Sequence, residues 1–428
     1  MKISKGIKLL TAALSTVLLF LGVSLFSKKS SAEEAVAARL PVNLNETLTN
    51  EMSDTSILAG IDAKVKEYMT YWGLKGVSLS VMRNDSLLYA KGFGIADTDR
   101  PMEPGNILRV ASVSKLVTAV GIMVLQDRGQ LSIKDTVFGP GGILNDSLYV
   151  AAIRDPLYRT ITVEDLLRHR GGFSRRGGDP MFSTRWIMMQ NGWTTVPTHE
   201  QLMELQLKRP LRFAPGTAQE YSNFGYLALS MIIEKVSGMS YEDFIQQNVL
   251  HPAGCLGFRI AGNYYKDKYP EEVRYYVQHD DEPADEFNNS GRKVVKCYGE
   301  NDIPRLQGAG AWCASAAELS RFIAAIDGMP GIPDILSATS IEAMTREMPN
   351  HAFSLGWNFT PSRQPWNRTG TLSGTSALVL VYPDGECWII LTNTSTWKGQ
   401  GFAKDNTAFF NRLRNRYSHL FPARDLFP

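Results

Sequence analysis

The chain has 428 residues, of which 44% are hydrophobic, and a chain of this size and composition can bury one substantial core. Its formal net charge of +2 excludes the strongly basic surface that is typical of nucleic-acid binding. The six histidines are scattered, and no Cys-x-x-Cys or His-x-x-x-His spacing occurs, so we expect no metal ion or other cofactor.

The N-terminal segment has the pattern of a secretory signal. Positive charges in residues 1–5 precede an apolar run over residues 9–26, and small residues precede a cleavage site near position 32, so residues 1–32 are predicted to be a signal peptide. The apolar run is also long enough for an uncleaved anchor, the one case in which we expect membrane contact. Either way we expect an exported protein, in a bacterial periplasm, with residues 33–55 as a polar tether.

Strand signals gather in two regions, residues 77–94 and 355–393, whereas the middle of the chain is mostly helical or irregular. Because both ends supply strands, we expect one antiparallel sheet built from both, with a mostly helical lobe inserted at roughly residues 125–300. A final helix over residues 402–417 would pack on this sheet. The sequence thus predicts an α+β fold for one domain over residues 56–428.

A buried helix is predicted directly after Ser112. Apolar residues occur on nearly every side of the run over residues 113–124, which ends near Gly129. Ser112 would lie in the first turn, where free N–H groups and the positive end of the helix dipole favour a developing anion. Lys115 is three positions further on, so its amine would lie on the same helix face as the hydroxyl.

The Ser-x-x-Lys spacing alone is weak evidence, because about one copy is expected by chance in a chain of this length. The chain holds a second copy, from Ser395 to Lys398, which follows a strand-like run and is predicted to be a loop. The helical context of Ser112 favours a catalytic nucleophile. The alternative is that Ser112 only caps the helix and that Lys115 is a solvated charge.

Tyr221-Ser222-Asn223 is the only Tyr-x-Asn string in the chain. It follows the turn-rich residues 213–217 and precedes a helical stretch over residues 226–236. A phenol with an amide two residues on can supply proton transfer and substrate positioning. The alternative is that Tyr221 is a core residue whose hydroxyl is satisfied internally.

The third candidate motif is Arg368-Thr369-Gly370, which supplies a cation, a hydroxyl and a bare backbone. It precedes two strand candidates, residues 377–382 and 387–392, which are joined by a Pro-Asp-Gly hairpin signal. Gly370 would let a substrate backbone approach closely. Brought together, the three motifs contain the parts of a serine acyl-transfer site without a His/Asp pair.

With these motifs in this order, the sequence resembles the serine β-lactamase and penicillin-binding protein superfamily, in the branch of class C β-lactamases and D-alanyl-D-alanine carboxypeptidases. The resemblance runs from roughly residue 57 to residue 393. It includes a stretch over residues 76–94 that looks like the family's opening hairpin, and residues 161–169, which look like the segment before its substrate loop. The resemblance implies a β-lactamase/transpeptidase-like fold.

The resemblance also implies a role for each motif residue. Ser112 would be the nucleophile that forms a covalent acyl-enzyme, and Lys115 would take its proton or hold the proton network. Tyr221 would act as acid and base, and Asn223 would orient the substrate amide or the Lys115 amine. The oxyanion hole would combine the N–H of Ser112 with that of Thr371. A free lysine, with a pKa of ~10.4, needs burial and nearby positive charge for this task.

The chain departs from the family at Arg368, where Lys or His is usual. Arginine does not give up its proton in a protein, which excludes a proton relay through this position. Its charge remains and its planar fork suits a carboxylate, so we expect a small-molecule or peptide substrate that carries a carboxylate. The alternative is that Arg368 turns outward to solvent.

His169 is a further candidate base, but we expect it to fix the loop that leaves a helix. That loop, residues 170–179, and a second one, residues 279–296, are predicted to lie on the surface, and the first could border the substrate.

The cysteines are even in number and exported, so one or more disulfides are allowed, but four buried thiols are an equal alternative. They are Cys255, Cys297, Cys313 and Cys387.

The sequence therefore predicts an exported serine hydrolase that works through an acyl-enzyme on Ser112. A D-alanyl-D-alanine carboxypeptidase-like peptidase or an esterase is the leading hypothesis. A class C-like β-lactamase is the first alternative, and a non-hydrolysing sensor that binds penicillin or peptidoglycan is the second. The oligomeric state is not indicated.

Overall fold

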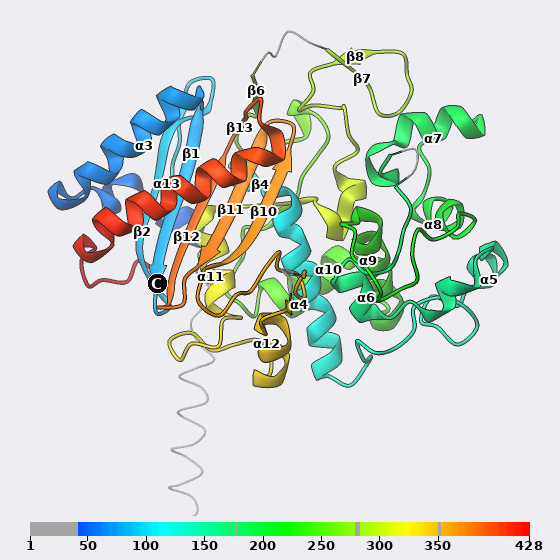
Figure 1. Cartoon of the computed structure of the whole chain (residues 1–428). Helices are drawn as coiled ribbons and strands as arrows, with labels where there is room; N and C mark the ends of the chain where they lie inside the picture. The colour runs from blue at the N-terminus through cyan, green and yellow to red at the C-terminus, as the bar shows by residue number, and fades with distance from the viewer. Residues whose placement is uncertain (1–41, 176–177, 279–282, 350–351) are drawn as a thin grey trace, which may run out of the picture. The chain divides into compact units, whose positions relative to one another are not determined.

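The structure is a computed structural model that describes residues 42–175, 178–278, 283–349 and 352–428. Within these residues the largest sheet has six strands, in the order β10-β11-β12-β1-β2-β3 (Figure 1). The strands are β1 (Gly76–Arg83), β2 (Ser86–Asp97), β3 (Arg100–Pro101), β10 (Trp366–Leu372), β11 (Thr375–Val381) and β12 (Glu386–Thr392).

The sheet joins the two ends of the domain. β1 pairs antiparallel with β12, so that Val77 lies opposite Thr392 and Arg83 lies opposite Glu386. β11 and β12 form the hairpin that the Pro-Asp-Gly string predicts, and Gly385 has a φ of 83°, which glycine adopts without strain. The prediction of one antiparallel sheet built from both ends is confirmed.

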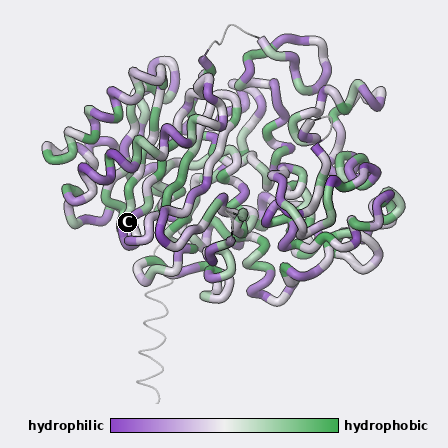
Figure 2. The backbone as a smooth tube through the Cα atoms, viewed as in Figure 1, coloured by the Kyte–Doolittle hydropathy of each residue, from purple (hydrophilic) through white to green (hydrophobic). Residues whose placement is uncertain are grey.

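Helices α3 (Ala59–Trp72) and α13 (Phe402–Tyr417) cover one face of the sheet (Figure 1). Val65 of α3 and Phe410 of α13 share a hydrophobic core with strand residues such as Trp388. Hydrophobic residues dominate β11 and β12, whereas hydrophilic residues dominate α13 (Figure 2). The predicted final helix is confirmed with the expected bounds.

The opposite face of the sheet packs against α11 (Ala316–Ala324), and the same core contains α4 (Ser114–Asp127). Strand residues such as Val379 and Ile389 belong to this core, because alternate side chains of a strand point to opposite faces. Residues 114–125 of α4 are all buried, so the predicted central helix is confirmed. α4 begins two residues after Ser112.

The middle of the chain is helical over a shorter span than predicted. Residues 251–303, as far as they are described, hold only two-residue strands, one 3-10 turn and irregular backbone, so a helical lobe at 125–300 is too long. Glycine and proline recur in this span and favour turns. The remaining helices are α2 (Leu44–Thr47), α5 (Ser147–Ala152), α6 (Val163–Leu167), α7 (Thr184–Asn191), α8 (His199–Leu207), α9 (Asn223–Ser237), α10 (Tyr241–Ile245) and α12 (Ala338–Thr345). The short strands are β4 (Leu108–Arg109), β5 (Arg259–Ile260), β6 (Tyr276–Val277), β7 (Ala284–Asp285), β8 (Lys293–Val294), β9 (Trp312–Ala314) and β13 (Thr394–Ser395).

The predicted tether over residues 33–55 is wrong for the part that is described. Leu44 and Leu48 are only 2% and 5% exposed, and the Asn45 side chain donates a hydrogen bond of 2.9 Å to the Glu318 carboxylate. Two apolar residues four positions apart are enough to dock this otherwise polar segment. The segment from residue 43 therefore belongs to the folded domain.

The predicted signal peptide, residues 1–32, lies outside the described residues. Among the helices that are described, none is both long enough and apolar enough to cross a membrane. All four cysteines are buried as thiols and not joined in a disulfide, so the structure favours the alternative of four buried thiols.

The docking of residues 43–48 predicts a measurable loss of stability on truncation of Leu44. We expect Leu44→Ala to lower the free energy of unfolding by about 2–4 kcal/mol, because it empties a buried site. Ile57→Ala, at a side chain that is 52% exposed, is the control and should cost less than about 0.5 kcal/mol. Urea unfolding of both variants measures the difference in free energy of unfolding. Equal losses for the two variants would support the prediction that this segment is an undocked tether.

Candidate active site

Ser112 lies in a short 3-10 turn, η3 (Ala111–Val113), that leads directly into α4. The preceding residue, Ala111, has a φ of +48°, in the left-handed region that residues other than glycine rarely adopt. Such backbone strain costs roughly 1–3 kcal/mol and is concentrated at functional sites. Ser112 is half-buried, so its side chain is held at the head of α4 and remains accessible.

Two other side chains meet the Ser112 hydroxyl. The Tyr221 hydroxyl donates a hydrogen bond of 2.7 Å to Ser112 Oγ, and Lys115 Nζ donates one of 3.2 Å to the same atom. Both distances are within the reach required for direct proton transfer. Segments more than one hundred residues apart are thereby joined at one oxygen.

The Lys115 side chain is fully buried, and its amine lies in a polar cage. Besides Ser112, it donates to Asn223 Oδ1 at 2.7 Å and to the main-chain carbonyl of Ala309. The pKa of Lys115 is lowered to about 8: burial is the largest cause and the positive charge of Arg368 adds to it, whereas Tyr221 opposes the shift. At pH 7 roughly a tenth of such an amine is neutral and able to accept a proton.

The pKa of Tyr221 lies below its usual value of 10. Burial would raise it, but the charges of Lys115 and Arg368 and the hydrogen bonds with Lys115 and Ser112 together outweigh that effect. The Lys115 amine also lies 4.9 Å from the centre of the Tyr221 ring, where a cation is attracted to the π face. The phenolate of Tyr221 is therefore easier to form than in water.

Asn223 is the first residue of α9, and the Ser222 side chain caps this helix by accepting a hydrogen bond from Gly225 N–H. The side-chain amide of Asn223 is held by two hydrogen bonds. Its Oδ1 accepts one from Lys115, and its Nδ2 donates one of 2.7 Å to Asp179 Oδ2. Asp179 therefore orients Asn223 so that an oxygen, and not an amino group, faces the Lys115 amine.

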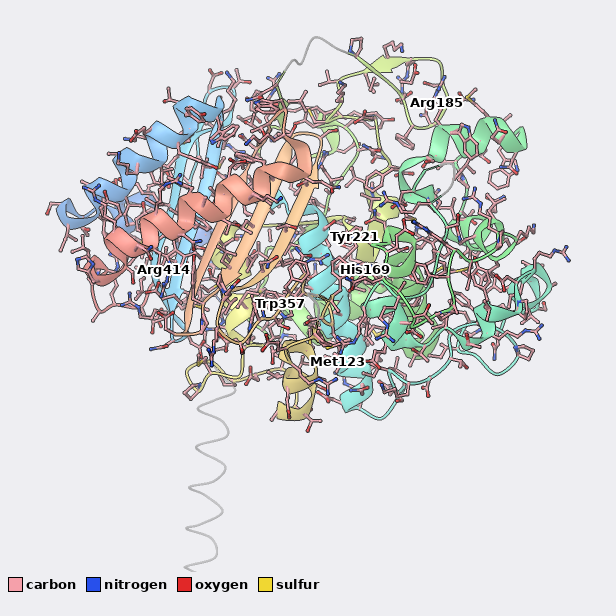
Figure 3. The ribbon with its side chains drawn as sticks, in the orientation of Figure 1. Met123, His169, Arg185, Tyr221, Trp357 and Arg414 are labelled. Carbon is pink, nitrogen blue, oxygen red and sulfur yellow. The ribbon has the colours of Figure 1, made fainter. Side chains whose placement is uncertain are left out.

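His169 holds the Tyr221 segment in place. It has a φ of 57°, its Nδ1 accepts from the Ser222 N–H at 3.1 Å, and its carbonyl accepts from the Glu220 N–H at 2.8 Å. The rings of His169 and Tyr221 lie 4.4 Å apart (Figure 3). Burial and the charges of Arg368 and Lys115 hold the His169 pKa well below 6.5. This geometry favours the loop-fixing interpretation over a base for Ser112.

The Arg368 side chain is fully buried, so it does not turn outward. Its Nε donates to the Ser112 carbonyl at 2.8 Å and its Nη1 donates to Asn358 Oδ1 at 2.8 Å, while Nη2 is buried without a partner among the described residues. Two of the three nitrogens of the fork expected to face a substrate carboxylate are therefore already engaged by the protein. Arg368 instead acts as a fixed positive charge behind the nucleophile.

Gly370 allows β10 to approach the nucleophile turn. A Cβ at this position would lie 2.1 Å from the Val110 carbonyl oxygen and 3.1 Å from Ser112 N, so only glycine fits. We expected a substrate backbone at this point, but the structure places the protein's own turn there. The Thr369 hydroxyl accepts a hydrogen bond of 2.9 Å from the Asn358 side chain, which also binds Arg368.

Thr371 presents its N–H at the free edge of β10. The N–H and carbonyl of Asn367 bond residues 358 and 359 on that edge, and in an antiparallel strand every second residue points the same way. Thr371 follows Asn367 by four positions and shares this direction. Its N–H thus lies on this edge, one residue after Gly370, which contacts the turn that holds Ser112.

The sequence did not indicate Asp179 or Asn358. Asp179 is the last residue of a predicted surface loop and Asn358 lies in no motif, so no spacing singles them out. Among the described residues, no three His, Cys, Asp or Glu side chains gather in a way that could hold a metal ion.

Comparison with known sequences identifies related proteins. A profile of the Beta-lactamase family matches residues 61–410 of this chain. A penicillin-binding protein of Bacillus subtilis (strain 168) is 30% identical over 197 residues, which cover 45% of this chain and 38% of that protein. Esterase EstB of Burkholderia gladioli is 27% identical over 308 residues, which cover 66% of this chain and 73% of EstB. The chain thus matches less than half of the first relative.

Two solved structures share the fold. The octameric penicillin-binding protein homologue from Pyrococcus abyssi aligns with a TM-score of 0.62 at 21% identity, covering 84% of this chain and 77% of its own. The D-amino acid amidase from Ochrobactrum anthropi SV3 aligns with a TM-score of 0.65 at 17% identity, covering 85% of this chain and 99% of its own. These alignments confirm the predicted α+β, β-lactamase/transpeptidase-like fold. Because the family profile covers most of its length, the chain belongs to the Beta-lactamase family.

Proposed function

We propose that the protein is an exported serine hydrolase that forms a covalent acyl-enzyme on Ser112 and cleaves small esters or peptide-like amides. The observation that carries the proposal is the contact of one accessible hydroxyl with two titratable groups, Tyr221 at 2.7 Å and Lys115 at 3.2 Å. Export rests on the signal-like pattern of residues 1–32.

In acylation, Ser112 Oγ attacks the carbonyl carbon of the substrate and gives its proton to neutral Lys115 or to the Tyr221 phenolate. The lowered pKa values of both groups support either route. The tetrahedral oxyanion accepts hydrogen bonds from the N–H groups of Ser112 and Thr371. When this intermediate collapses, the bond to the leaving group breaks, and Tyr221 returns a proton to the departing oxygen or nitrogen.

In deacylation, a water molecule attacks the ester that joins the acyl group to Ser112. Tyr221 takes a proton from this water, and the carboxylic acid product leaves as Ser112 recovers its own proton. Arg368 remains protonated throughout, because arginine does not titrate in this range. Its charge favours the phenolate and the neutral amine at the same time.

The position of Arg368 supports an acyl substrate that does not depend on a carboxylate contact at this residue. Its Nε and Nη1 are engaged by Ser112 and Asn358 and only Nη2 lacks a partner among the described residues, so a two-point contact with a substrate carboxylate would compete with buried hydrogen bonds. This favours the esterase or amidase form of the hypothesis over an efficient β-lactamase.

Ser112→Ala tests the proposal directly. We expect this variant to lose labelling by a fluorescent fluorophosphonate and to hydrolyse p-nitrophenyl acetate at least about a thousandfold more slowly, because the nucleophile is gone. Ser395→Ala, in another Ser-x-x-Lys string of the chain, is the matched control and should keep both activities.

Labelling that persists in Ser112→Ala would contradict the proposal. A fluorescent penicillin, followed over time on the wild type, separates a stable adduct from turnover. Rapid hydrolysis of a chromogenic cephalosporin would replace the esterase hypothesis with the β-lactamase alternative.

The charge of Arg368 predicts a characteristic pH dependence. In the wild type we expect kcat/KM for a neutral ester to rise with pH through a midpoint near pH 8, as Lys115 loses its proton, and to level off above it. Arg368→Gln removes a charge that lowers the pKa of Lys115 and of Tyr221, so the rise should move to higher pH, with at least a tenfold loss at pH 7.

Arg368→Lys is the control for this effect, because it keeps the positive charge and changes only the shape of the group. Its rise with pH should stay within about half a unit of the wild type. Identical pH profiles for the Gln and Lys variants would show that the charge of Arg368 does not tune the site.

Asp179 predicts the opposite shift. Its negative charge raises the pKa of Lys115, so Asp179→Asn should move the rise in kcat/KM to lower pH while keeping an oxygen that can accept from Asn223. Asp179→Ala also frees the Asn223 amide and should lower kcat roughly ten- to a hundredfold. A shift to higher pH in Asp179→Asn, or equal kcat for both variants, would contradict this positioning role.

A further inference from the structure

A cavity lies on the sheet face that is remote from Ser112. It has a volume of about 630 Å³ and is formed between α3 and α13, the two helices that cover this face (Figure 1). The sheet separates it from the core that contains α4. A volume of this size is typical of a small-molecule site, and the proposed hydrolase chemistry does not use it.

Aromatic rings form much of this groove. Tyr68 and Phe409 stack at its floor with their ring centres 4.0 Å apart, and Tyr71 meets Trp72 edge-on at 5.1 Å. Tyr71 is 79% exposed, and Trp397, whose ring lies 6.5 Å from that of Trp72, is 72% exposed. Large aromatic side chains exposed together beside a cavity are typical of a ligand surface.

The charges of the groove divide into paired and unpaired groups. Lys64 pairs with Glu67 at 2.6 Å, and Lys398 pairs with Asp405 at 2.9 Å, so each pair offers donors and an acceptor. Two further cations, Arg412 and Arg416, lie on successive turns of α13, and neither forms an ion pair with any described residue. The groove therefore has an excess of positive charge along one wall.

We propose that this groove binds an acidic saccharide. The flat aromatic rings suit the C–H faces of pyranose sugars, and the two ion pairs can exchange hydrogen bonds with hydroxyl groups at either end. The free guanidinium groups of α13 suit a carboxylate, which they can bind through two parallel hydrogen bonds. An anionic lipid surface would also use the arginines, but a layer of headgroups would leave the aromatic rings and the two ion pairs of the groove without a partner.

Isothermal titration of the full chain with a tetramer of α-1,4-linked galacturonic acid tests this site. We expect one saturable site, and at least tenfold weaker binding of the methyl-esterified tetramer, which differs only in charge. A double variant, Arg412→Gln with Arg416→Gln, should bind the acidic tetramer at least tenfold more weakly, and Tyr71→Ala should weaken both tetramers at least threefold.

Lys404→Gln, at an exposed cation of α13 outside the groove, is the matched control and should bind within twofold of the wild type. The double variant should also hydrolyse p-nitrophenyl acetate within twofold of the wild type, which separates this site from Ser112. The proposal is overturned if the acidic tetramer does not saturate, or if the double variant binds it as the control does. It is also overturned if vesicles of phosphatidylglycerol, and not the tetramer, bind in an arginine-dependent way.

Discussion

The burial of the Lys115 amine is the constraint on which the candidate site depends. One nitrogen contacts Ser112, the Asn223 side chain and the Ala309 carbonyl, and so joins α4, α9 and η8 (Pro304–Ala309). In water such an amine stays charged, but burial brings its pKa to about 8. Burial of this amine therefore has two effects: it holds three segments together, and it makes Lys115 a usable base. Arg368 and Asp179 then adjust that base in opposite directions.

Much of this arrangement could be predicted from the sequence. The apolar run after Ser112 specified a central helix, because no side of it was polar enough to face water. Strand signals at both ends of the domain specified one sheet, and the Pro-Asp-Gly string specified the hairpin of β11 and β12. The meeting of Ser112, Lys115 and Tyr221 followed from three short motifs and a family resemblance.

What could not be predicted depends on contacts between residues that share no motif. Asp179 acts through a hydrogen bond to Asn223, forty-four positions away, and a lone aspartate in a loop carries no signal of that partner. The charge of Arg368 is evident from the sequence, but the direction of its side chain is not. That direction depends on the register of β10 and on the hydrogen bond to Asn358. The polar composition of residues 33–55 predicts a tether. Leu44 and Leu48 are nevertheless buried and dock the described part of this segment on the domain.

β10 is the outermost strand at one side of the sheet, and unpaired strand edges invite pairing between separate molecules. Here the bridge between Phe359 and Asn367 covers its beginning, and the turn around Val110 presses against Gly370 further along. Of these two contacts, only the bridge occupies N–H and carbonyl groups of the edge itself, because the Gly370 contact lies on a face of the strand. The bridge that holds β10 beside Phe359 therefore also shortens the edge at which a second molecule could pair.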